Sequence, residues 1–393
     1  MISLRHLFFQ NIAQTSHNPI ALEIQKAKGI YLYDSRGKEY IDLISGIAVS
    51  NVGHLHKNVV NAVKKQLNHY MHTMVYGEHI QSPQVKLAKL ITDVLPKSMD
   101  NVYFVNSGSE ANEGALKLAK RFTGRSEIIY CKNAYHGSTH GALSVLGNED
   151  FKNSFRPLLP DTQQINFNCE KNLDKISKKT ACVIVEPIQG EAGIITPKRD
   201  YLKKLLNRCN QKNALLILDE IQTGFGRTGK LFAFEHYNIE PHIITFAKGL
   251  GGGMPIGAFV APNYIMKNYK KNPILGHITT FGGHPVSCAA SLASLKTIIT
   301  NNLIDTTKKE ALFKKILKHK HIKEVRGKGL MLAVQLSKTE QVQKLMDICM
   351  KNGVIIDWFL FCDNAFRIAP PLIINQKQIK KACAIILKCL NQI

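Results

Sequence analysis

The chain has 393 residues, which is enough for two or three domains and a sizeable hydrophobic core. Apolar residues make up 45% and charged residues 21%, values near those of globular proteins, which excludes a disordered, collagenous or coiled-coil chain. Lysine and arginine number 52 against 29 aspartate and glutamate, and the net charge of +23 raises the question of a polyanionic or membrane-surface partner.

The cysteines and the N-terminal residues bear on the cellular compartment. Nine cysteines are scattered along the chain without a Cys-x-x-Cys pair, so we expect reduced thiols. Residues 1–14 lack the apolar core and the cleavage pattern of a signal peptide, and no apolar run approaches the roughly 18 residues that span a bilayer. We therefore expect a cytoplasmic protein with no membrane partner.

Taken in chain order, the apolar runs predict a large α/β domain and a smaller α+β domain. Residues 29–47 predict two short strands around a turn, and from 101 to 260 short β-rich runs alternate with helical segments. This alternation predicts a doubly wound, mostly parallel sheet. Its predicted strands are 101–105, 182–186, 214–220 and 242–247.

The small domain is expected to combine both ends of the chain. Beyond residue 286 the sequence is lysine-rich and helical, then carries β-like runs at 354–357 and 366–370 and a last amphipathic helix. We place an N-terminal segment at 1–50 that packs with the small domain, the large domain at 51–290 and the C-terminal small domain at 291–393.

The residues after the first strand of the large domain suggest an anion site. Asn106-Ser107-Gly108-Ser109-Glu110 lead from the strand at 101–105 into a helix with small or apolar residues at helical spacing. Free backbone N–H groups and the helix dipole favour a phosphate at such a turn. Many turns of this kind only cap a helix, so the pattern alone leaves both interpretations open.

Two charged side chains end predicted strands of the same sheet. Asp219 ends the strand at 214–220, and a carboxylate there needs a partner because burial of an unpaired charge is costly. Lys248 follows the strand at 242–247 and precedes a glycine-rich run, where burial would lower its pKa and make the amine nucleophilic. Each residue alone also fits a structural or solvated role. Together with the turn at 106–110, which we call the anion turn, they match the needs of pyridoxal phosphate: a phosphate cradle, a carboxylate for the ring nitrogen and an amine.

The segment 224–230 fits two nucleotide-binding patterns but lacks their context. It matches Gly-x-Gly-x-x-Gly and Gly-x-x-x-x-Gly-Lys, yet Leu231 stands where a serine or threonine would bind Mg²⁺, and Pro241 stops the segment that follows. The 15 histidines include no His-Glu-x-x-His pattern. We expect neither nucleotide binding nor a metal site.

Seven blocks of the sequence resemble those of the class III pyridoxal-phosphate-dependent aminotransferases, which include acetylornithine, ornithine and diamine aminotransferases. The resemblance covers nearly the whole chain, and the blocks follow the family's order. They are NSGSEANEGALKLAKR (106–121), YHG (135–137), EPIQGEAG (186–193), LDEIQTGFGRTG (218–229), FAKGLGGGMPIGA (246–258), TTFGGHP (279–285) and RIAPPL (367–372).

The resemblance implies the type I fold of pyridoxal-phosphate-dependent transferases, a homodimer and a role for each matching residue. Lys248 would attach the cofactor, Asp219 would pair with its ring nitrogen, and both would be catalytic. Thr280 would reach the phosphate bound by the partner subunit. The implied cofactor site comprises Ser107, Gly108, Ser109, Tyr135, His136, Glu186, Asp219, Gln222, Lys248 and Thr280.

The resemblance also implies a ping-pong transamination with two substrates. Asp219 would keep the ring nitrogen protonated, and Lys248 would move the substrate's proton. Arg367 would bind the α-carboxylate of 2-oxoglutarate, and Glu191 would neutralise Arg367 while an ω-amine donor occupies the site. The fold also supports decarboxylases, racemases, mutases and non-catalytic or nucleic-acid-binding proteins, but this pair favours transamination.

One position departs from the family pattern and leaves the donor open. Acetylornithine and ornithine enzymes continue the YHG block with an arginine for the donor's distal carboxylate, whereas Ser138 follows Gly137 here. The segment 141–160 is more similar to diamine enzymes. Arg156 is a candidate to replace the missing arginine, and Glu78 near the pocket mouth would favour a cationic tail, but both residues also fit plain surface roles. We expect N-acetylornithine or ornithine as the donor; the alternative is a diamine such as putrescine, or another ω-amine, with 2-oxoglutarate or pyruvate as acceptor.

The excess of positive charge matches no nucleic-acid-binding module. Only ten of the 52 basic residues are arginine, and the lysines cluster on expected helices or loops without interleaved aromatic residues. We therefore expect no specific nucleic-acid partner. We expect the positive charge to matter for function at only two places, where one phosphate and one carboxylate bind.

Overall fold

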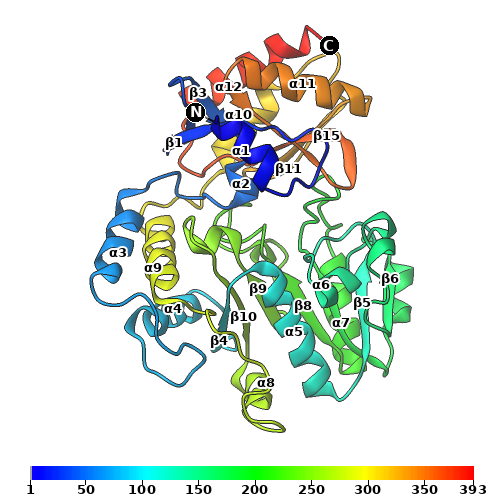
Figure 1. The fold of residues 1–393 in the computed structure, drawn as a ribbon. Coiled ribbons are helices and arrows are strands. Elements are labelled where there is room, and N and C mark those ends of the chain that lie inside the picture. Colours follow the sequence, from blue (N-terminus) through cyan, green and yellow to red (C-terminus); the bar gives the residue numbers. More distant parts are fainter. Residues whose placement is uncertain (1) are drawn as a thin grey trace.

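The protein, described here from a computed structural model over residues 2–393, has a larger α/β unit with a smaller unit stacked on it (Figure 1). Within these residues the larger unit contains one seven-stranded sheet. Its order is β4 (Asn101–Val105), β10 (Gly257–Ala261), β9 (Ile243–Phe246), β8 (Leu215–Asp219), β7 (Thr180–Val185), β5 (Glu127–Cys131) and β6 (Thr162–Ile165). β10 runs antiparallel to both of its neighbours, and the other neighbours are parallel. The predicted doubly wound, mostly parallel sheet is confirmed.

Helices cover both faces of this sheet, which explains why β7, β8 and β9 are buried along their whole length. The helix α5 (Gly108–Thr123) packs on one face, where the position of Gly114 leaves room for the ring of Phe259. The other face is covered by α4 (Ser82–Asp93), α7 (Tyr201–Lys212) and α9 (Pro285–Thr300). A sheet buried in this way exposes functional groups only at its edges and strand ends.

The smaller unit joins the two ends of the chain. One sheet of the described chain has the order β1 (Ile24–Lys28), β2 (Tyr31–Asp34), β3 (Glu39–Asp42) and β13 (Val354–Ile355). A second has the order β11 (Glu324–Lys328), β12 (Met331–Gln335), β15 (Cys362–Ile368) and β14 (Asp357–Phe359). The helices α10 (Thr307–Ile316), α11 (Thr339–Lys351) and α12 (Gln376–Leu390) share a hydrophobic core with these sheets. The boundaries at residues 50 and 290 stay a prediction.

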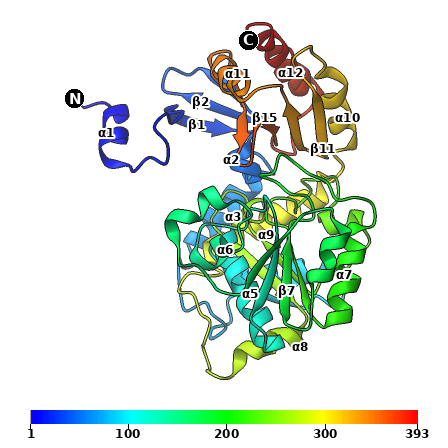
Figure 2. The same cartoon turned by 90° about the vertical axis from the view of Figure 1, so that its right-hand side faces the viewer.

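The remaining α-helices are short or peripheral. They are α1 (Leu4–Asn11), α2 (Ser45–Ala48), α3 (Lys57–Leu67), α6 (His140–Ser144) and α8 (Asn263–Met266). Figure 2 shows α1 projecting from the smaller unit, and none of its residues is buried. Among residues 2–393, no helix combines the length and apolarity needed to cross a membrane.

The strand predictions were right where apolar runs are buried and incomplete elsewhere. The strand expected at 101–105 is β4, and the turn near residue 35 lies between β2 and β3 as expected. The run at 354–357 is wrong as one strand, because β13 ends at Ile355 and β14 begins at Asp357 in a different sheet. The run at 366–370 is only the end of β15, which stops before Pro370 and Pro371.

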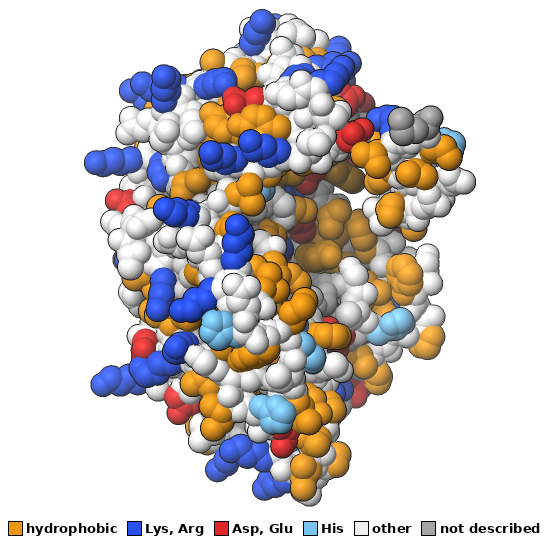
Figure 3. Space-filling view, turned by 60° about the vertical axis from the view of Figure 1, so that its left-hand side comes forward, with side chains coloured by type: hydrophobic (Ala, Val, Ile, Leu, Met, Phe, Trp, Pro, Cys, Tyr) orange, Lys and Arg blue, Asp and Glu red, His pale blue; other side chains and the backbone are white. Residues whose placement is uncertain are grey.

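The basic side chains are distributed over both units. Figure 3 shows lysine and arginine spread from the top of the smaller unit to the bottom of the larger one. On the face that Figure 3 draws, the basic side chains are interspersed with neutral and hydrophobic ones, as is typical of solvated side chains.

Candidate active site

A cavity of about 460 Å³ lies where β4, β8 and β9 end, beneath the smaller unit. Ten of the twelve predicted site residues line it, and Arg367 contacts one of these ten through an ion pair. The lining residues are Ser107, Gly108, Ser109, Tyr135, His136, Glu186, Glu191, Asp219, Gln222 and Lys248. Thr280 is exposed and does not line the cavity of its own chain.

The anion turn forms as the sequence suggests. Ser107 caps α5 by accepting a hydrogen bond from Glu110 N, and the helix begins at Gly108. A Cβ at Gly108 would lie 2.9 Å from Ile221 Cδ1, so the Ile221 side chain would have to shift to make room for it. Ser109 Oγ accepts a hydrogen bond from Ser138 N at 3.3 Å. This helix start presents its dipole and backbone N–H groups to the cavity, which suits a phosphate.

Asp219 is oriented by three hydrogen bonds at the end of β8. Its Oδ2 lies 2.7 Å from His136 Nδ1 and accepts a 2.8 Å bond from Asn112 Nδ2, while Oδ1 accepts from Ile221 N at 3.0 Å. Asn112 also donates to His136 O. The sequence analysis missed Asn112, although a polar residue on the buried face of α5 was a usable signal. These bonds fix the orientation of the Asp219 carboxyl group in the cavity wall.

Lys248 lies two residues after the end of β9 in a strained backbone conformation. Its φ is 42°, which is unusual for a residue with a side chain. Burial lowers the pKa of Lys248, and the nearby carboxylate of Glu191 opposes that shift. A buried lysine of this kind reaches the neutral, nucleophilic form more readily than one in water.

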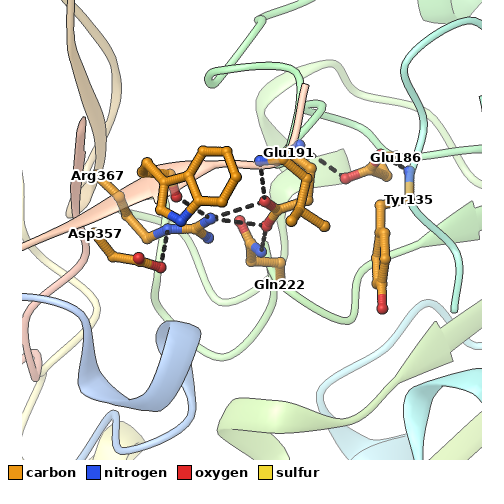
Figure 4. Close-up of polar contacts among 9 residues, drawn as sticks. Tyr135, Glu186, Glu191, Gln222, Asp357 and Arg367 are labelled. Atoms are coloured by element: carbon orange, nitrogen blue, oxygen red, sulfur yellow. Dashed lines mark hydrogen bonds and ion pairs between the residues drawn. The ribbon is translucent and has the colours of Figure 1, made fainter. Parts of the chain in front are cut away.

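Glu186 and Tyr135 form the side of the cavity opposite Arg367 (Figure 4). Glu186 accepts hydrogen bonds from Gly190 N at 2.8 Å and Tyr135 N at 3.1 Å. Burial raises the pKa of Glu186 to about 7, against the opposing charge of His136. The hydroxyl of Tyr135 lies 3.2 Å from Ser138 Oγ, so a neutral pair occupies the place where an arginine was expected from the family.

Glu191 and Arg367 face each other across the two units (Figure 4). Arg367 Nη2 lies 2.9 Å from both carboxylate oxygens of Glu191. Glu191 also accepts bonds from Leu360 N at 3.2 Å and Gln222 Nε2 at 3.4 Å. Burial tends to raise the pKa of Glu191, but Arg367 and Lys248 hold it below its usual value. The pair is therefore ionised and reaches from the small-unit strand β15 to the cavity.

Neither residue considered for the donor's tail lines the cavity. Arg156 is half-exposed and forms an ion pair with Glu149 at 2.5 Å. Glu78 is exposed, and it too is absent from the cavity wall.

The segment 224–230 has a structural role instead of the nucleotide geometry. It runs into a short 3-10 helix at Ala233–His236 rather than a long helix. Arg227 points into the interior, where it donates to Leu330 O and Pro370 O. This arrangement agrees with the interpretation that the glycine pattern lacks its functional context.

The residues of the cavity fit pyridoxal phosphate. The turn at Gly108 presents a helix start, Asp219 accepts hydrogen bonds from Asn112 and Ile221, and Lys248 lies in the wall of the same cavity. Of the atoms described in residues 2–393, His136 Nε2 and Asn112 Oδ1 are buried without a hydrogen-bond partner. Buried polar atoms of this kind commonly complete their bonds through a ligand or water.

Comparison with known proteins agrees with the geometry. Residues 12–390 match the family model of class III aminotransferases. The chain is 38% identical over 363 residues to acetylornithine aminotransferase of Methanopyrus kandleri, covering 91% of each chain. It is 40% identical over 369 residues to that of Methanocaldococcus jannaschii, covering 90% of this chain and 89% of the relative. The ornithine aminotransferase structure from Toxoplasma gondii superposes with a TM-score of 0.91 at 30% identity, over 98% of this chain and 92% of that chain.

Proposed function

From the premise that the chain belongs to the class III aminotransferases, as the match over residues 12–390 shows, we propose that it moves an amino group from N-acetylornithine or ornithine to 2-oxoglutarate. The protein is a transaminase of fold type I that uses pyridoxal phosphate. The single observation that carries the proposal is the buried Glu191–Arg367 ion pair beside Lys248. An enzyme with two alternating substrates needs Arg367 for only one of them, and Glu191 can neutralise Arg367 while the other is bound.

The roles of the cofactor residues follow from their contacts. Pyridoxal phosphate, when bound, supplies a ring that accepts the electrons released at the amine-bearing carbon. The backbone of Ser107, Gly108 and Ser109 would hold the phosphate through free N–H groups. Asp219, which Asn112 and His136 orient, would pair with the ring nitrogen.

Proton transfer is assigned to Lys248. Its amine lies in the cavity wall, and burial favours its neutral form. Nζ would take the proton from the amine-bearing carbon of the substrate and would later give it up again, because a tethered base acts at a high effective concentration. Gln222 lies beside Glu191 and is assigned to the ring hydroxyl.

The two substrates are distinguished at Arg367. An ω-amine donor carries no carboxylate next to its reacting carbon, so Glu191 covers the guanidinium during that half-reaction. The α-carboxylate of 2-oxoglutarate then replaces Glu191 at Arg367, where a charge-assisted bond orients the oxo acid. Leu360 N and Gln222 remain as donors near Glu191.

A diamine donor is the second candidate, because Tyr135, which lines the cavity, and the neighbouring Ser138 are both neutral. An N-acetylornithine carboxylate would find hydroxyl groups there instead of a guanidinium, whereas putrescine needs no such partner. The names of the relatives favour acetylornithine, whereas the neutral side chains of Tyr135 and Ser138 favour the diamine.

We further propose a homodimer in which Thr280 completes the partner's phosphate site. Thr280 is exposed, and the adjacent Thr279 receives a 2.8 Å hydrogen bond from Asn106, a residue of the cavity wall. Mixing Thr280→Val chains with Lys248→Ala chains tests this. If the site is shared, one centre of each hybrid dimer carries both defects and the other carries neither, so activity is partly recovered.

A cytoplasmic location is also proposed. All nine cysteines of the chain are free, and seven of them are buried. Free thiols in this number suit a reducing compartment.

A panel of donors tests the proposed reaction. Purified holoenzyme is mixed separately with N-acetylornithine, ornithine, putrescine and 4-aminobutyrate, and the visible band of the bound cofactor is followed without an acceptor. We expect N-acetylornithine or ornithine to bleach the band fastest and 2-oxoglutarate to restore it. Bleaching by putrescine alone would replace the donor assignment, and no bleaching by any amine would contradict the transaminase.

A further inference from the structure

Arg367 lies between two carboxylates, and only one of them has a role so far. Asp357 on β14 is the register partner of Arg367 on β15, and its Oδ2 lies 4.0 Å from Arg367 Nε. Register partners in an antiparallel pair extend their side chains on the same face of the sheet. Figure 4 shows Asp357 and Glu191 at different ends of the guanidinium.

The hydrogen bonds of Arg367 are concentrated on one nitrogen. Nη2 bonds both oxygens of Glu191 and donates to Trp358 O at 3.3 Å. Within residues 2–393, Nε and Nη1 are buried and have no hydrogen-bond partner. The guanidinium also lies 4.6 Å from the centre of the Phe359 ring, which fixes its plane. The edge of the guanidinium near Asp357 is therefore free to bond.

When Glu191 moves away from Arg367, the buried guanidinium needs another negative charge nearby. Arg367 is 2% exposed, so without Glu191 its charge would be buried and uncompensated. Glu191 belongs to the larger unit, whereas Asp357 is fixed beside Arg367 by the backbone pairing of β14 with β15. Asp357 therefore stays with the arginine whatever Glu191 does.

We propose that Asp357 is a positioning residue for the oxo-acid half-reaction. Its carboxylate holds the Nε edge of Arg367 and balances the charge while the α-carboxylate of the oxo acid takes the place of Glu191. The inference deepens the proposed function and rests on it.

The test compares holoenzyme of the wild type with Asp357→Asn, Asp357→Glu and the control Asp363→Asn. Asp363 is an exposed aspartate of the same hairpin, so its substitution changes the same charge away from Arg367. Each half-reaction is followed separately by the cofactor band. Binding of glutarate, a dicarboxylate that cannot react, is measured by calorimetry.

We expect Asp357→Asn to lower kcat/KM of the oxo-acid half-reaction about tenfold and to weaken glutarate binding by a similar factor. The amine half-reaction should stay within twofold, and Asp363→Asn should match the wild type in every measurement. Asp357→Glu keeps the charge and should bind glutarate more tightly than Asp357→Asn.

Three results would overturn the inference. They are an equal loss in both half-reactions, wild-type glutarate binding by Asp357→Asn, and glutarate binding by Asp357→Glu no tighter than that of Asp357→Asn. A failure of the proposed function looks different, because no amine would then bleach even the wild type. The glutarate measurement still reports on Asp357 in that case.

Discussion

Two buried arginines show how the same side chain serves different purposes in this fold. Arg227 is 0% and Arg367 2% exposed. Arg227 donates to neutral oxygens of three separate segments, at Leu330, Pro370 and Asn51, and burial lowers its pKa to about 9. Arg367 instead faces carboxylates. Several neutral acceptors fix a guanidinium in place, whereas an ionic partner can be exchanged for the carboxylate of a substrate.

Two buried glutamates repeat this contrast. Glu220 follows β8 and accepts hydrogen bonds from Ala233 N and Phe234 N, and burial raises its pKa to about 7. Glu191 faces a cation, and its pKa is held below the usual value despite burial. We call the segment 220–234 with its contacts to the smaller unit the joint. In the joint, Arg227 and Glu220 have neutral hydrogen-bond partners, whereas Glu191 and Arg367 beside the cavity pair with each other.

The largest expected effect concerns Arg367 in the cavity. Arg367→Met should lower kcat/KM of the oxo-acid half-reaction about a thousandfold, roughly 4 kcal/mol, because the substrate carboxylate loses its charged partner. Single-turnover measurements with 2-oxoglutarate check this. The control is Arg156→Met, a half-exposed arginine outside the cavity wall, which should stay within twofold. An equal loss in the amine half-reaction would contradict the role of Arg367 as the partner of the oxo-acid carboxylate.

The next effect concerns Arg227 in the joint. Arg227→Met should lower the free energy of unfolding by about 3 kcal/mol, because it leaves the oxygens of Leu330, Pro370 and Asn51 without their charged donor. Urea denaturation measures it. The matched control is Arg125→Met, since Arg125 also donates to three backbone oxygens but is only partly buried, so that water replaces it at a cost of about 1 kcal/mol. Similar losses in the two variants would contradict the role given to burial.

Glu220, whose pKa is raised, should make the stability of the fold fall with rising pH, whereas the pKa of Glu191 is lowered. A carboxyl whose pKa is raised from 4.5 to about 7 contributes its full stability below pH 4.5, and this contribution is lost as the pH rises through 7. Between pH 5 and 8, the free energy of unfolding should therefore fall by about 2 kcal/mol less in Glu220→Gln than in the wild type. Urea titrations at several pH values, with the exposed Glu340→Gln as control, provide the measurement. An unchanged slope would show that Glu220 does not titrate in this range.

The smallest predicted effect is that of Glu191. Glu191→Gln leaves Arg367 uncovered, so the amine half-reaction should slow about tenfold, roughly 1.4 kcal/mol, while the oxo-acid half-reaction should not slow. Stopped-flow traces of the two half-reactions give the ratio. Equal slowing of both would mean that Glu191 acts outside the choice between substrates.

Most of the cavity could be predicted because its residues follow strand ends. The buried runs of β4, β8 and β9 are apolar, so their carboxyl ends, and with them Gly108, Asp219 and Lys248, can be located in the sequence. Exposed strands such as β1 and β11 carry no such signal: β1 is mostly exposed and β11 includes no buried residue.

Contacts that depend on register and helix facing could not be predicted. Asn112 reaches Asp219 only because α5 turns that position toward the sheet. Asp357 meets Arg367 through the pairing of β14 with β15, which contains an irregularity between Trp358 and Phe359. A one-residue change of register would have put Asp357 on the other face.

The central claim is that the cavity acts through Lys248. Borohydride reduction of the holoenzyme, followed by peptide mass spectrometry, tests it most directly. We predict one reduced pyridoxal phosphate per chain, on the peptide that contains Lys248, and no labelled peptide in Lys248→Ala. Attachment at a different lysine, or equal labelling of Lys248→Ala, would contradict the account.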